Sequence, residues 1–299
     1  MHFLEQRASH FLRRIVAAWI APLSRIGCKG EKMAQHDDKA PGVDCISQPD
    51  LGAGDAYAYP KWKDWGAEAF GVLSQRDEAD FSAHLRRSGM LLPPGSRVLE
   101  MGFGNGGFLT YARKRGWDIT GTEINPELVR RATEHGFCAR HAENLALFSE
   151  NHFDFVIIYD VLEHIPQERL LDLLSDVKRV LKDDGMLIAR FPNGDSPFSR
   201  FSQHGDPTHL TTIGSLKAKY FAATLNMKVV YVGGELQPLR AGLPHFAYRI
   251  VANPIRFLMN AFLNFMFCPG NHKSLCTTNL IMILRKTHAD PSTDTGLSD

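Results

Sequence analysis

Short apolar runs and longer amphipathic segments alternate along the chain from residue 97 onward. Three short, mostly apolar runs predict buried strands at Arg97–Met101, Phe153–Tyr159 and Gly185–Phe191. A further strand is predicted at Asp118–Glu123 from its place in the alternation. Between them, apolar residues recur every three or four positions, which is typical of helices that cover a sheet. These repeats predict helices at Phe108–Arg115, from Pro126 to just before Gly136, and from Pro166 to Leu181. The alternation predicts an α/β fold around a mostly parallel sheet with both faces covered.

The last strands are expected to pair differently. The late β segments Lys228–Val232 and Asn279–Leu284 suit an antiparallel pair. They bring the strands located in the sequence to six, one fewer than in the doubly wound sheet of seven strands that we expect. Between the two late segments lies an insertion, residues 233–277, which holds the apolar helix candidate Ile255–Phe267. The sheet is therefore expected to be mostly parallel, with an antiparallel β pair at the end of the chain.

Composition divides the chain into four parts. Residues 1–28 predict an amphipathic helix, and residues 29–56 are rich in Gly, Asp, Pro and Ser without any period, which indicates a linker. The folded domain is expected to span residues 57–286, with a helical lead-in over residues 57–90. Residues 287–299 predict a disordered tail.

The N-terminal helix, residues 1–27, has two interpretations. Its apolar stripe, with arginines off the stripe, is typical of a helix that packs on the body of a protein, which we prefer. The alternative is a helix that lies on an anionic membrane surface, with Trp19 at the boundary. The apolar run Ile15–Leu23 is about half of the ~20 residues that a spanning helix needs, and no signal-peptide cleavage site follows it. We therefore expect no segment able to span a bilayer and a location inside the cell.

Charge and cysteine content exclude several classes of partner. The 299-residue chain has 34 basic and 33 acidic residues and a net charge of +1, which gives no support to a nucleic-acid partner. Five cysteines without a CxxC pair indicate reduced thiols and a cytoplasmic protein. Cys268, His272 and Cys276 offer three ligands where a structural zinc site takes four, so no metal site is expected.

A glycine-rich stretch, residues 100–107 (EMGFGNGG), separates the first predicted strand from its helix. Glycines there let the backbone turn tightly and approach a ligand, and the helix N-terminus offers free N–H groups. Glu123 ends the next predicted strand, where a carboxylate accepts hydrogen bonds from both hydroxyls of a ribose. This arrangement predicts a site for a cofactor that contains a nucleoside.

An NAD-dependent dehydrogenase is the rival interpretation, because Gly102, Gly104 and Gly107 satisfy GxGxxG. The carboxylate of Glu100 counts against it, since a carboxylate suits a cationic amino group better than a pyrophosphate. The stretch 159–165 (YDVLEHI), directly after a strand, also counts against it. So does the final antiparallel pair, which stands in place of a second mononucleotide-binding half.

Five stretches of the chain carry a family resemblance: RVLEMGFGNGGF, TEINPE, HAENL, FDFVIIYDVLEHI and LKDDGMLIARFPN. They resemble the class I S-adenosylmethionine-dependent methyltransferases, in particular the group with ubiquinone-pathway and polysaccharide-associated O-methyltransferases. The resemblance covers about residues 95–232 and the final strand. It implies a Rossmann-like fold, S-adenosyl-L-methionine as cofactor, and methyl transfer as the activity.

The resemblance also implies which residues bind the cofactor. The glycine loop would line its methionine part, and the end of the second strand would hold its ribose. Glu143 stands where an aspartate is more usual. The implied set is Glu100, Gly102, Gly104 and Gly106 for the methionine part, Asp160 and Val161 below the sulfonium, Glu123 for the ribose, and Ile124, Ala142 and Glu143 beside the adenine.

Transfer to a hydroxyl needs a base, because a neutral alcohol is a poor nucleophile until its proton is taken. The loop after the last predicted parallel strand leaves the edge of the sheet where open α/β folds bind ligands. We expect His209 to be the general base, oriented by Asp206, with His204 as the alternate. The competing interpretation is that these residues cap a helix predicted at Thr212–Thr224 and fix the loop. His164 is expected to make a structural hydrogen bond.

The acceptor stays open between a hydroxyl of a sugar or lipid-linked saccharide and a small phenolic or quinone-like molecule. The helix at 255–267 is expected either to pack on the sheet edge or to cover the acceptor or a membrane surface. Membrane contact through residues 1–27 or 255–267 would make the protein peripheral at the inner face of the membrane. A cofactor-binding protein without catalysis is the alternative from another class.

Overall fold

The computed structural model describes residues 63, 65–142, 144–235, 238 and 243–287. All of them belong to one compact unit, Ser47–Asp299. The amphipathic helix and the linker expected before residue 57, the expected tail, and Glu143 lie outside the described residues. Those expectations therefore stay predictions.

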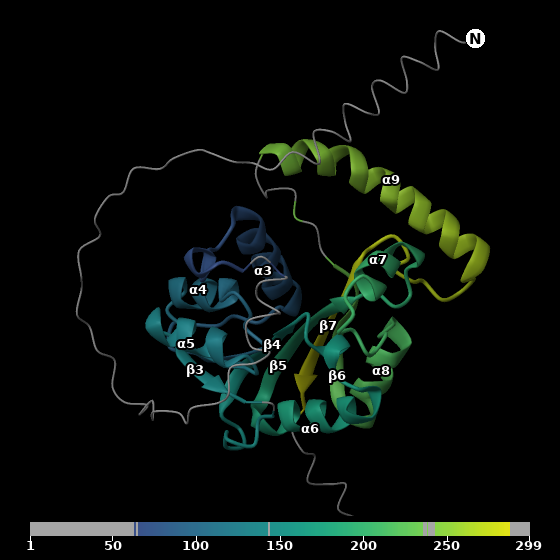
Figure 1. Ribbon diagram of the computed structural model, residues 1–299. Coiled ribbons are helices and arrows are strands. Elements are labelled where there is room, and N and C mark those ends of the chain that lie inside the picture. The colour runs from purple at the N-terminus through teal and green to yellow at the C-terminus, as the bar shows by residue number, and fades with distance from the viewer. Residues whose placement is uncertain (1–62, 64, 143, 236–237, 239–242, 288–299) are drawn as a thin grey trace, which may run out of the picture. The chain divides into compact units, whose positions relative to one another are not determined.

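Seven strands within the described residues form one sheet in the order β3-β2-β1-β4-β5-β7-β6 (Figure 1). They are β1 Arg97–Met101, β2 Asp118–Glu123, β3 Cys138–His141, β4 Phe153–Tyr159, β5 Leu181–Pro192, β6 Met227–Gly234 and β7 Asn279–Lys286. Strands β1 to β5 pair in parallel, and β7 is antiparallel to both β5 and β6. The predicted Rossmann-like, mostly parallel sheet with an antiparallel pair at its end is confirmed.

Strand β4 lies at the centre of the sheet because both of its faces are apolar. Residues Phe155, Val156, Ile157 and Ile158 are fully buried between β1 and β5. Strand β3 was not predicted. Its sequence, CARH, has no apolar run and no alternation, and it becomes a strand by pairing with β2.

The helices begin and end close to their sequence signals. They are α3 Gln75–Ser88, α4 Gly107–Lys114, α5 Pro126–Glu134, α6 Leu170–Val180, α7 Arg200–His204 and α8 Ser215–Thr224, with short 3-10 turns η1 Ala67–Ala69, η2 Leu162–His164, η3 Gln167–Arg169 and η4 Pro197–Ser199. The side chain of Asn125 accepts hydrogen bonds from the first turn of α5, as expected of an N-cap. Helix α6 begins later than predicted because Pro166 is extended, with ψ 140°, and a 3-10 turn follows it.

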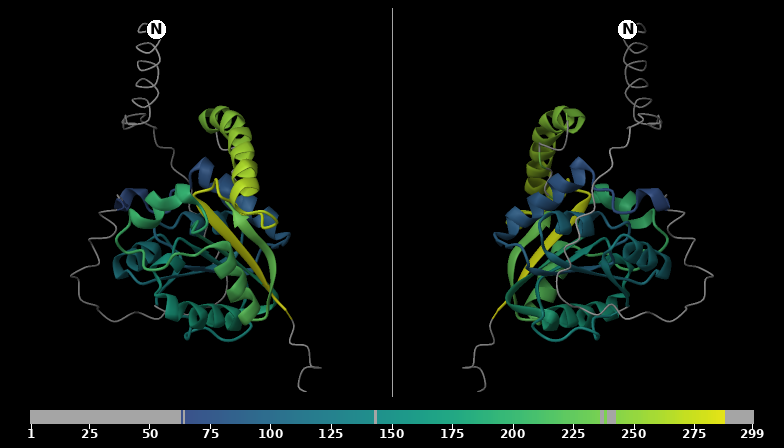
Figure 2. Two further views of the ribbon diagram at one scale, coloured as in Figure 1. Left: turned by 90° about the vertical axis from the view of Figure 1, so that its right-hand side faces the viewer. Right: turned by 90° about the vertical axis from the view of Figure 1, so that its left-hand side faces the viewer.

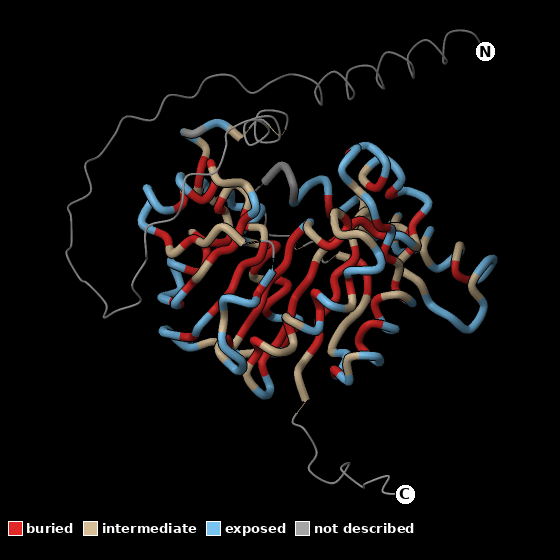
Figure 3. Tube along the Cα trace, turned by 60° about the horizontal axis from the view of Figure 1, so that its bottom comes forward, coloured by how far each residue is buried: buried red, intermediate tan, exposed pale blue. Residues whose placement is uncertain are grey.

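Two apolar clusters, one on each face of the sheet, form the core (Figure 3). Helices α3, α4 and α5 cover one face, for example through Phe81, Leu109 and Leu128. Helices α6 and α8 cover the other through Leu174 and Phe221. The parallel strands point their carboxyl ends to the same edge, where the loops after β1, β2, β4 and β5 come together.

The helix predicted at Ile255–Phe267 is longer than expected. Helix α9 runs from Leu243 to Phe267 and continues through Pro254, which interrupts the helical pattern in the sequence. By length and composition its segment Phe246–Phe267 is able to cross a membrane, so the expectation that no segment could do so is wrong. Only 6% of its most apolar window is buried, so α9 does not pack its apolar residues on the sheet (Figure 2).

Candidate active site

The loop between β1 and α4 turns on three glycines in the left-handed region, with φ of 71° at Gly102, 51° at Gly104 and 72° at Gly106. Glycine adopts these angles without strain. A Cβ on Gly102 would lie 2.4 Å from Cγ2 of Val161. A Cβ on Gly104 would lie 2.9 Å from the ring of Trp65. The loop therefore tolerates no side chain at either position, and its close contacts depend on glycine.

The segment before α3 lies on this loop and fixes its shape. The side chain of Asn105 donates a hydrogen bond to the carbonyl oxygen of Ala69 at 2.7 Å, and the N–H of Gly71 donates to the carbonyl of Asn105 at 2.7 Å. Phe70 is buried against Gly106. No periodic pattern in the sequence predicts this contact, since residues 65–72 hold only one short 3-10 turn.

Glu123 sits at the end of β2 with its carboxylate aimed at the glycine loop. One oxygen accepts hydrogen bonds from the N–H groups of Ile124 and Asn125 at 2.8 and 3.1 Å, and the other from the N–H of Gly104 at 3.1 Å. Burial raises the pKa of Glu123, although these three hydrogen bonds oppose the rise. The oxygen that accepts from Gly104 keeps acceptor capacity for a further donor, as a ribose hydroxyl requires.

Glu100 lies at the end of β1 and is 4% exposed. Its Oε2 atom has no hydrogen-bond partner among the described residues. Burial, followed by the nearby charge of Glu123, raises its pKa well above the ordinary value. A buried carboxyl oxygen without a partner fits the amino group of a bound ligand, which would satisfy the oxygen and stabilise its charged form.

Two residues predicted beside the adenine lie next to Glu123. Ile124 is largely exposed, and its carbonyl oxygen lies 2.8 Å from Nε2 of His141. The N–H of Ala142 donates to the carbonyl oxygen of Glu123 at 3.2 Å. The structure thus places Ile124 and Ala142 at one end of the glycine loop and leaves an exposed apolar surface there.

Asp160 and Val161 follow β4 at the same edge. Asp160 has φ of 55°, which is uncommon for a residue other than glycine, and the turn brings Val161 against Gly102. The carboxylate of Asp160 pairs with Arg190 of β5, whose guanidinium also reaches Glu235 at 3.3 Å. Burial would lower the pKa of Arg190, but the two carboxylates outweigh it and raise that pKa.

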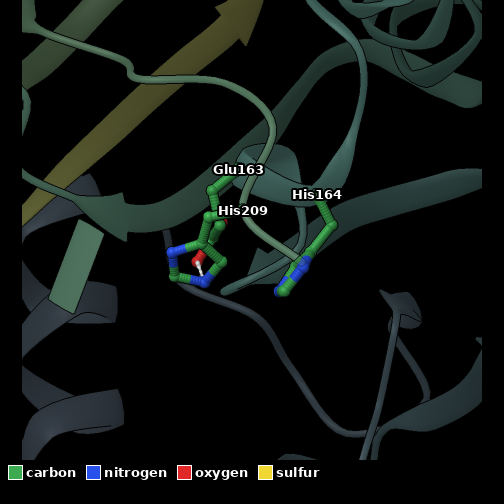
Figure 4. Close-up of side chains that lie close together, drawn as sticks. All are labelled: Glu163, His164 and His209. Carbon is green, nitrogen blue, oxygen red and sulfur yellow. Dashed lines mark ion pairs between the residues drawn. The ribbon is translucent and has the colours of Figure 1, made fainter. Parts of the chain in front are cut away.

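A second cluster lies directly after this turn: Glu163, His164 and His209 (Figure 4). The first two belong to η2, and His209 comes from the loop after α7. Backbone N–H groups of Leu210 and Thr211 donate to the carbonyl oxygen of Glu163 at 2.8 and 3.0 Å and hold that loop in place. The structure therefore brings the predicted base beside residues that follow β4.

The donor atoms of this cluster lie within 4.8 Å of one another. A carboxylate with two imidazoles is a donor set that zinc accepts, and it also suits transfer of a proton. Within the described part of the chain, this cluster rather than Cys268, His272 and Cys276 gathers potential metal ligands.

The hydrogen bonds of His209 define which of its nitrogens is basic. Nδ1 lies 3.1 Å from the carbonyl oxygen of Gln203. Because a carbonyl only accepts, Nδ1 carries the proton, and Nε2 is the basic nitrogen of the neutral ring. Nε2 lies 3.9 Å from Oε1 of Glu163 and 3.7 Å from Oδ2 of Asp206. Gln203, and not Asp206 as predicted, holds the ring by a hydrogen bond.

The two carboxyl groups near His209 differ in charge. Burial would raise the pKa of Asp206, but hydrogen bonds from Thr208 and Lys63 outweigh it and hold that pKa at about 2. Burial, followed by the charge of Asp160, raises the pKa of Glu163 to about 8. At neutral pH the imidazole therefore faces an ionised Asp206 and a largely protonated Glu163.

Of the other histidines considered from the sequence, one lies outside the cluster and one makes a structural hydrogen bond. His204 is exposed at the end of α7. His164 makes the expected structural hydrogen bond, with Nδ1 2.9 Å from the hydroxyl of Thr208. The first turn of α8 is capped by Asp195, whose carboxylate accepts from the N–H of Ser215 at 2.9 Å. The histidine loop therefore does not cap this helix. The other half of that alternative, that these residues fix the loop, agrees with Asp206, whose Oδ1 accepts from the N–H and the hydroxyl of Thr208.

Sequence reasoning missed four residues of this edge: Lys63, Trp65, Glu163 and Arg190. Glu163 stands beside His164 in the sequence, but nothing in the sequence indicates that its side chain is buried. Arg190 interrupts an apolar strand, which is the one signal that could have identified it. Lys63 and Trp65 reach the site only through the fold of the lead-in segment, which no local pattern predicts.

Comparisons with known proteins agree with this geometry. A sequence model of the family described as "Methyltransferase domain" matches residues 72–223, about half of the chain. The chain is 34% identical over 104 residues to a 2-methyl-6-phytyl-1,4-hydroquinone methyltransferase of Synechocystis, which covers 32% of each chain. It is also 34% identical over 103 residues to a ubiquinone biosynthesis O-methyltransferase of Xanthomonas campestris, covering 31% of this chain and 42% of that protein.

The chain thus spans less than half the length of these curated relatives. Among solved structures, a SAM-dependent methyltransferase of Archaeoglobus fulgidus has the same fold, with a TM-score of 0.52 and 22% identity over 70% of this chain and 94% of that one. The glycine loop, the partnerless Oε2 of Glu100 and the placement of Glu123 fit the cofactor of such enzymes, S-adenosylmethionine. The chain belongs to the methyltransferase domain family and has the fold of the class I S-adenosylmethionine-dependent methyltransferases.

Proposed function

We propose that this protein methylates a hydroxyl group, with His209 as the general base. The observation that carries the proposal is the orientation of His209. Its Nδ1–H is held by the carbonyl oxygen of Gln203, and its basic Nε2 faces Glu163 and Asp206, one turn beyond the residues at the end of β4. An amine or carbanion acceptor would not need such a base.

When bound, the cofactor would supply a methyl group attached to a sulfonium sulfur. The sulfur is the leaving group, and it departs as a neutral thioether without help from an acid. The residues of the chain have two tasks. The glycine loop, Glu100 and Glu123 hold the cofactor so that the acceptor oxygen meets the methyl carbon in line, and such positioning supplies ~7–11 kcal/mol of the barrier. His209 takes the proton of the hydroxyl at Nε2 as the new oxygen–carbon bond forms.

Asp206 and Glu163 act on His209 in different ways. The ionised Asp206, 3.7 Å from Nε2, stabilises the imidazolium that forms when the proton arrives. Lys63 and Thr208 hold that carboxylate in place. Glu163 contributes a carboxyl group that is largely neutral at pH 7, so Nε2 is not surrounded by two negative charges before the reaction.

The acceptor we propose is a hydroxyl on a small aromatic or lipid-linked molecule. Two relatives are named for a phytyl hydroquinone and for ubiquinone biosynthesis, and one of them is named an O-methyltransferase. A saccharide hydroxyl is the second candidate for the same chemistry.

Mass spectrometry of products made with methyl-labelled S-adenosylmethionine tests this proposal. Extract from cells that lack the protein is incubated with the purified full chain, and molecules that gain the label are identified. His209→Ala is expected to lower turnover by about 10²–10⁴-fold while binding of S-adenosylhomocysteine stays close to wild type.

His204→Ala is the matched control, because His204 lies in the same segment and is exposed. It is expected to retain wild-type turnover. A label on carbon or nitrogen, or full turnover by His209→Ala, would contradict the proposed chemistry while leaving the cofactor assignment intact.

A further inference from the structure

Helix α9 presents its polar side to the protein and its apolar side to the solvent. Arg249, Arg256, Asn260 and Asn264 are spaced seven, four and four residues apart, so they share one face of the helix. Arg249 is 4% exposed and Asn264 is 2% exposed. A helix on a water-soluble protein normally has the opposite arrangement.

Hydrogen bonds attach this polar face to the domain along its whole length. Near the start, the guanidinium of Arg249 donates to the carbonyl oxygen of Pro238 and lies 3.8 Å from Asp80 of α3. Near the end, Asn264 donates to the carbonyl of Lys273 at 2.8 Å and accepts from its N–H at 2.6 Å. The orientation of α9 is therefore fixed by polar contacts.

The opposite face is apolar and exposed. Val251, Ile255, Leu258, Phe262 and Phe265 are spaced four, three, four and three residues apart, and each is at least 58% exposed. This spacing forms one continuous stripe of about four turns. Ile250, Phe257 and Met266 beside it are also exposed, so the apolar surface is wider than the stripe. Such a surface needs a partner that excludes water.

Length and composition identify the kind of partner. The segment Phe246–Phe267 is long and apolar enough to cross a membrane. A partner helix would normally be selected by charged residues that flank the apolar stripe, but the flanks here are apolar. Arg249 and Lys273 face Asp80 and Asp195, so they do not supply free charge, but residues 236–289 contain no Asp or Glu that would repel anionic headgroups. The surface therefore matches the acyl region of a bilayer and is compatible with anionic headgroups.

The polar contacts also decide how α9 would sit in a membrane. The segment Phe246–Phe267 is long enough to cross a bilayer. Crossing would break the bonds of Asn260 and Asn264 and place Arg249 and Arg256 in hydrocarbon. Lying in the plane keeps all of these contacts and buries only the apolar face.

We propose that the apolar face of α9 docks in the plane of an anionic lipid bilayer. Helix α9 lies on the side of the sheet where the loops after β4 and β5 end (Figures 1 and 2). Lys273, directly after it, contacts Asp195 of the loop after β5 at 3.5 Å. If the proposed O-methylation is correct, the docked orientation would present the active-site edge to acceptors held in the membrane; docking itself does not depend on it.

Flotation of the full-length protein with phosphatidylglycerol–phosphatidylcholine vesicles tests this proposal. The wild type is expected to float. Phe262→Asp/Phe265→Asp is expected to float at least about tenfold less, since each substitution removes a large apolar side chain from the lipid. Leu91→Asp, which replaces an exposed leucine outside α9, is expected to float like the wild type. Binding of S-adenosylhomocysteine by each variant shows that it is folded, independently of any methyl transfer.

Three results would overturn the proposal. The first is no lipid binding by the wild type. The second is equal binding after the double substitution, which would assign binding to another segment. The third is a dimer that the double substitution dissociates, with no lipid binding, which would assign the face to a second copy of the chain.

Discussion

A comparison of Gly102→Ala with Gly136→Ala separates two costs of placing a side chain on a glycine: the left-handed backbone and a close contact with a neighbouring side chain. Gly102 has φ of 71°, and a Cβ there would lie 2.4 Å from Cγ2 of Val161. Gly136 has φ of 73°, but a Cβ there would meet nothing within 4 Å. A left-handed backbone costs about 1–2 kcal/mol for an alanine, and an overpacked contact costs about 1–3 kcal/mol more. Gly136→Ala therefore carries the first cost alone, and Gly102→Ala carries both.

Urea unfolding and calorimetry with S-adenosylhomocysteine measure these effects. Gly136→Ala is expected to lower the free energy of unfolding by about 1–2 kcal/mol and to bind the ligand like the wild type. Gly102→Ala is expected to lose about 2–5 kcal/mol and to bind more weakly, because Val161 or the loop must move. Equal stability and equal ligand affinity in the two variants would refute the argument that close packing on Val161 shapes the cofactor site.

Two further predictions concern buried ionisable groups. His84 is fully buried beside the hydroxyl of Tyr159, and burial lowers its pKa from 6.5 to about 3. Since the unfolded chain binds this proton between those values and the folded chain does not, stability should fall as pH drops from about 6.5 towards 3, by up to about 1.4 kcal/mol per pH unit. In His84→Gln that part of the slope should be absent from urea unfolding curves; an unchanged slope would assign it to other groups. Separately, Glu123→Ala should weaken S-adenosylhomocysteine binding by about tenfold to a hundredfold in calorimetry, through loss of hydrogen bonds to a charged acceptor, and intact binding would break the ribose assignment.

The sheet was predictable because its strands are buried on both faces. Three strands were predicted with the bounds that the structure has: Arg97–Met101, Asp118–Glu123 and Phe153–Tyr159. Apolar runs define the first and third, and the second follows from its place between two predicted helices. The strand Cys138–His141 was not predicted, because its pairing with β2, and not its own composition, makes it a strand. The length of helix α9 was underestimated because Pro254 indicates a helix end in the sequence, whereas the helix continues through it.

The residues of the candidate site also fall into a group that the sequence predicts and a group that it does not. Glu100, Gly102 and Glu123 were predictable because each occupies a fixed position relative to a strand end. Glu163 and Lys63 were not, because their contacts with His209 and Asp206 join segments far apart in the chain. Local patterns predict where strands end, but they do not predict which loops meet beyond those ends.

A crystal structure with S-adenosylhomocysteine bound tests the central claim most directly. The account predicts that the ribose hydroxyls contact Glu123, that the amino group lies at the buried oxygen of Glu100, and that the sulfur faces the side of the site where His209 lies. A ligand bound elsewhere, or one whose ribose avoids Glu123, would contradict the assignment of this edge as the active site.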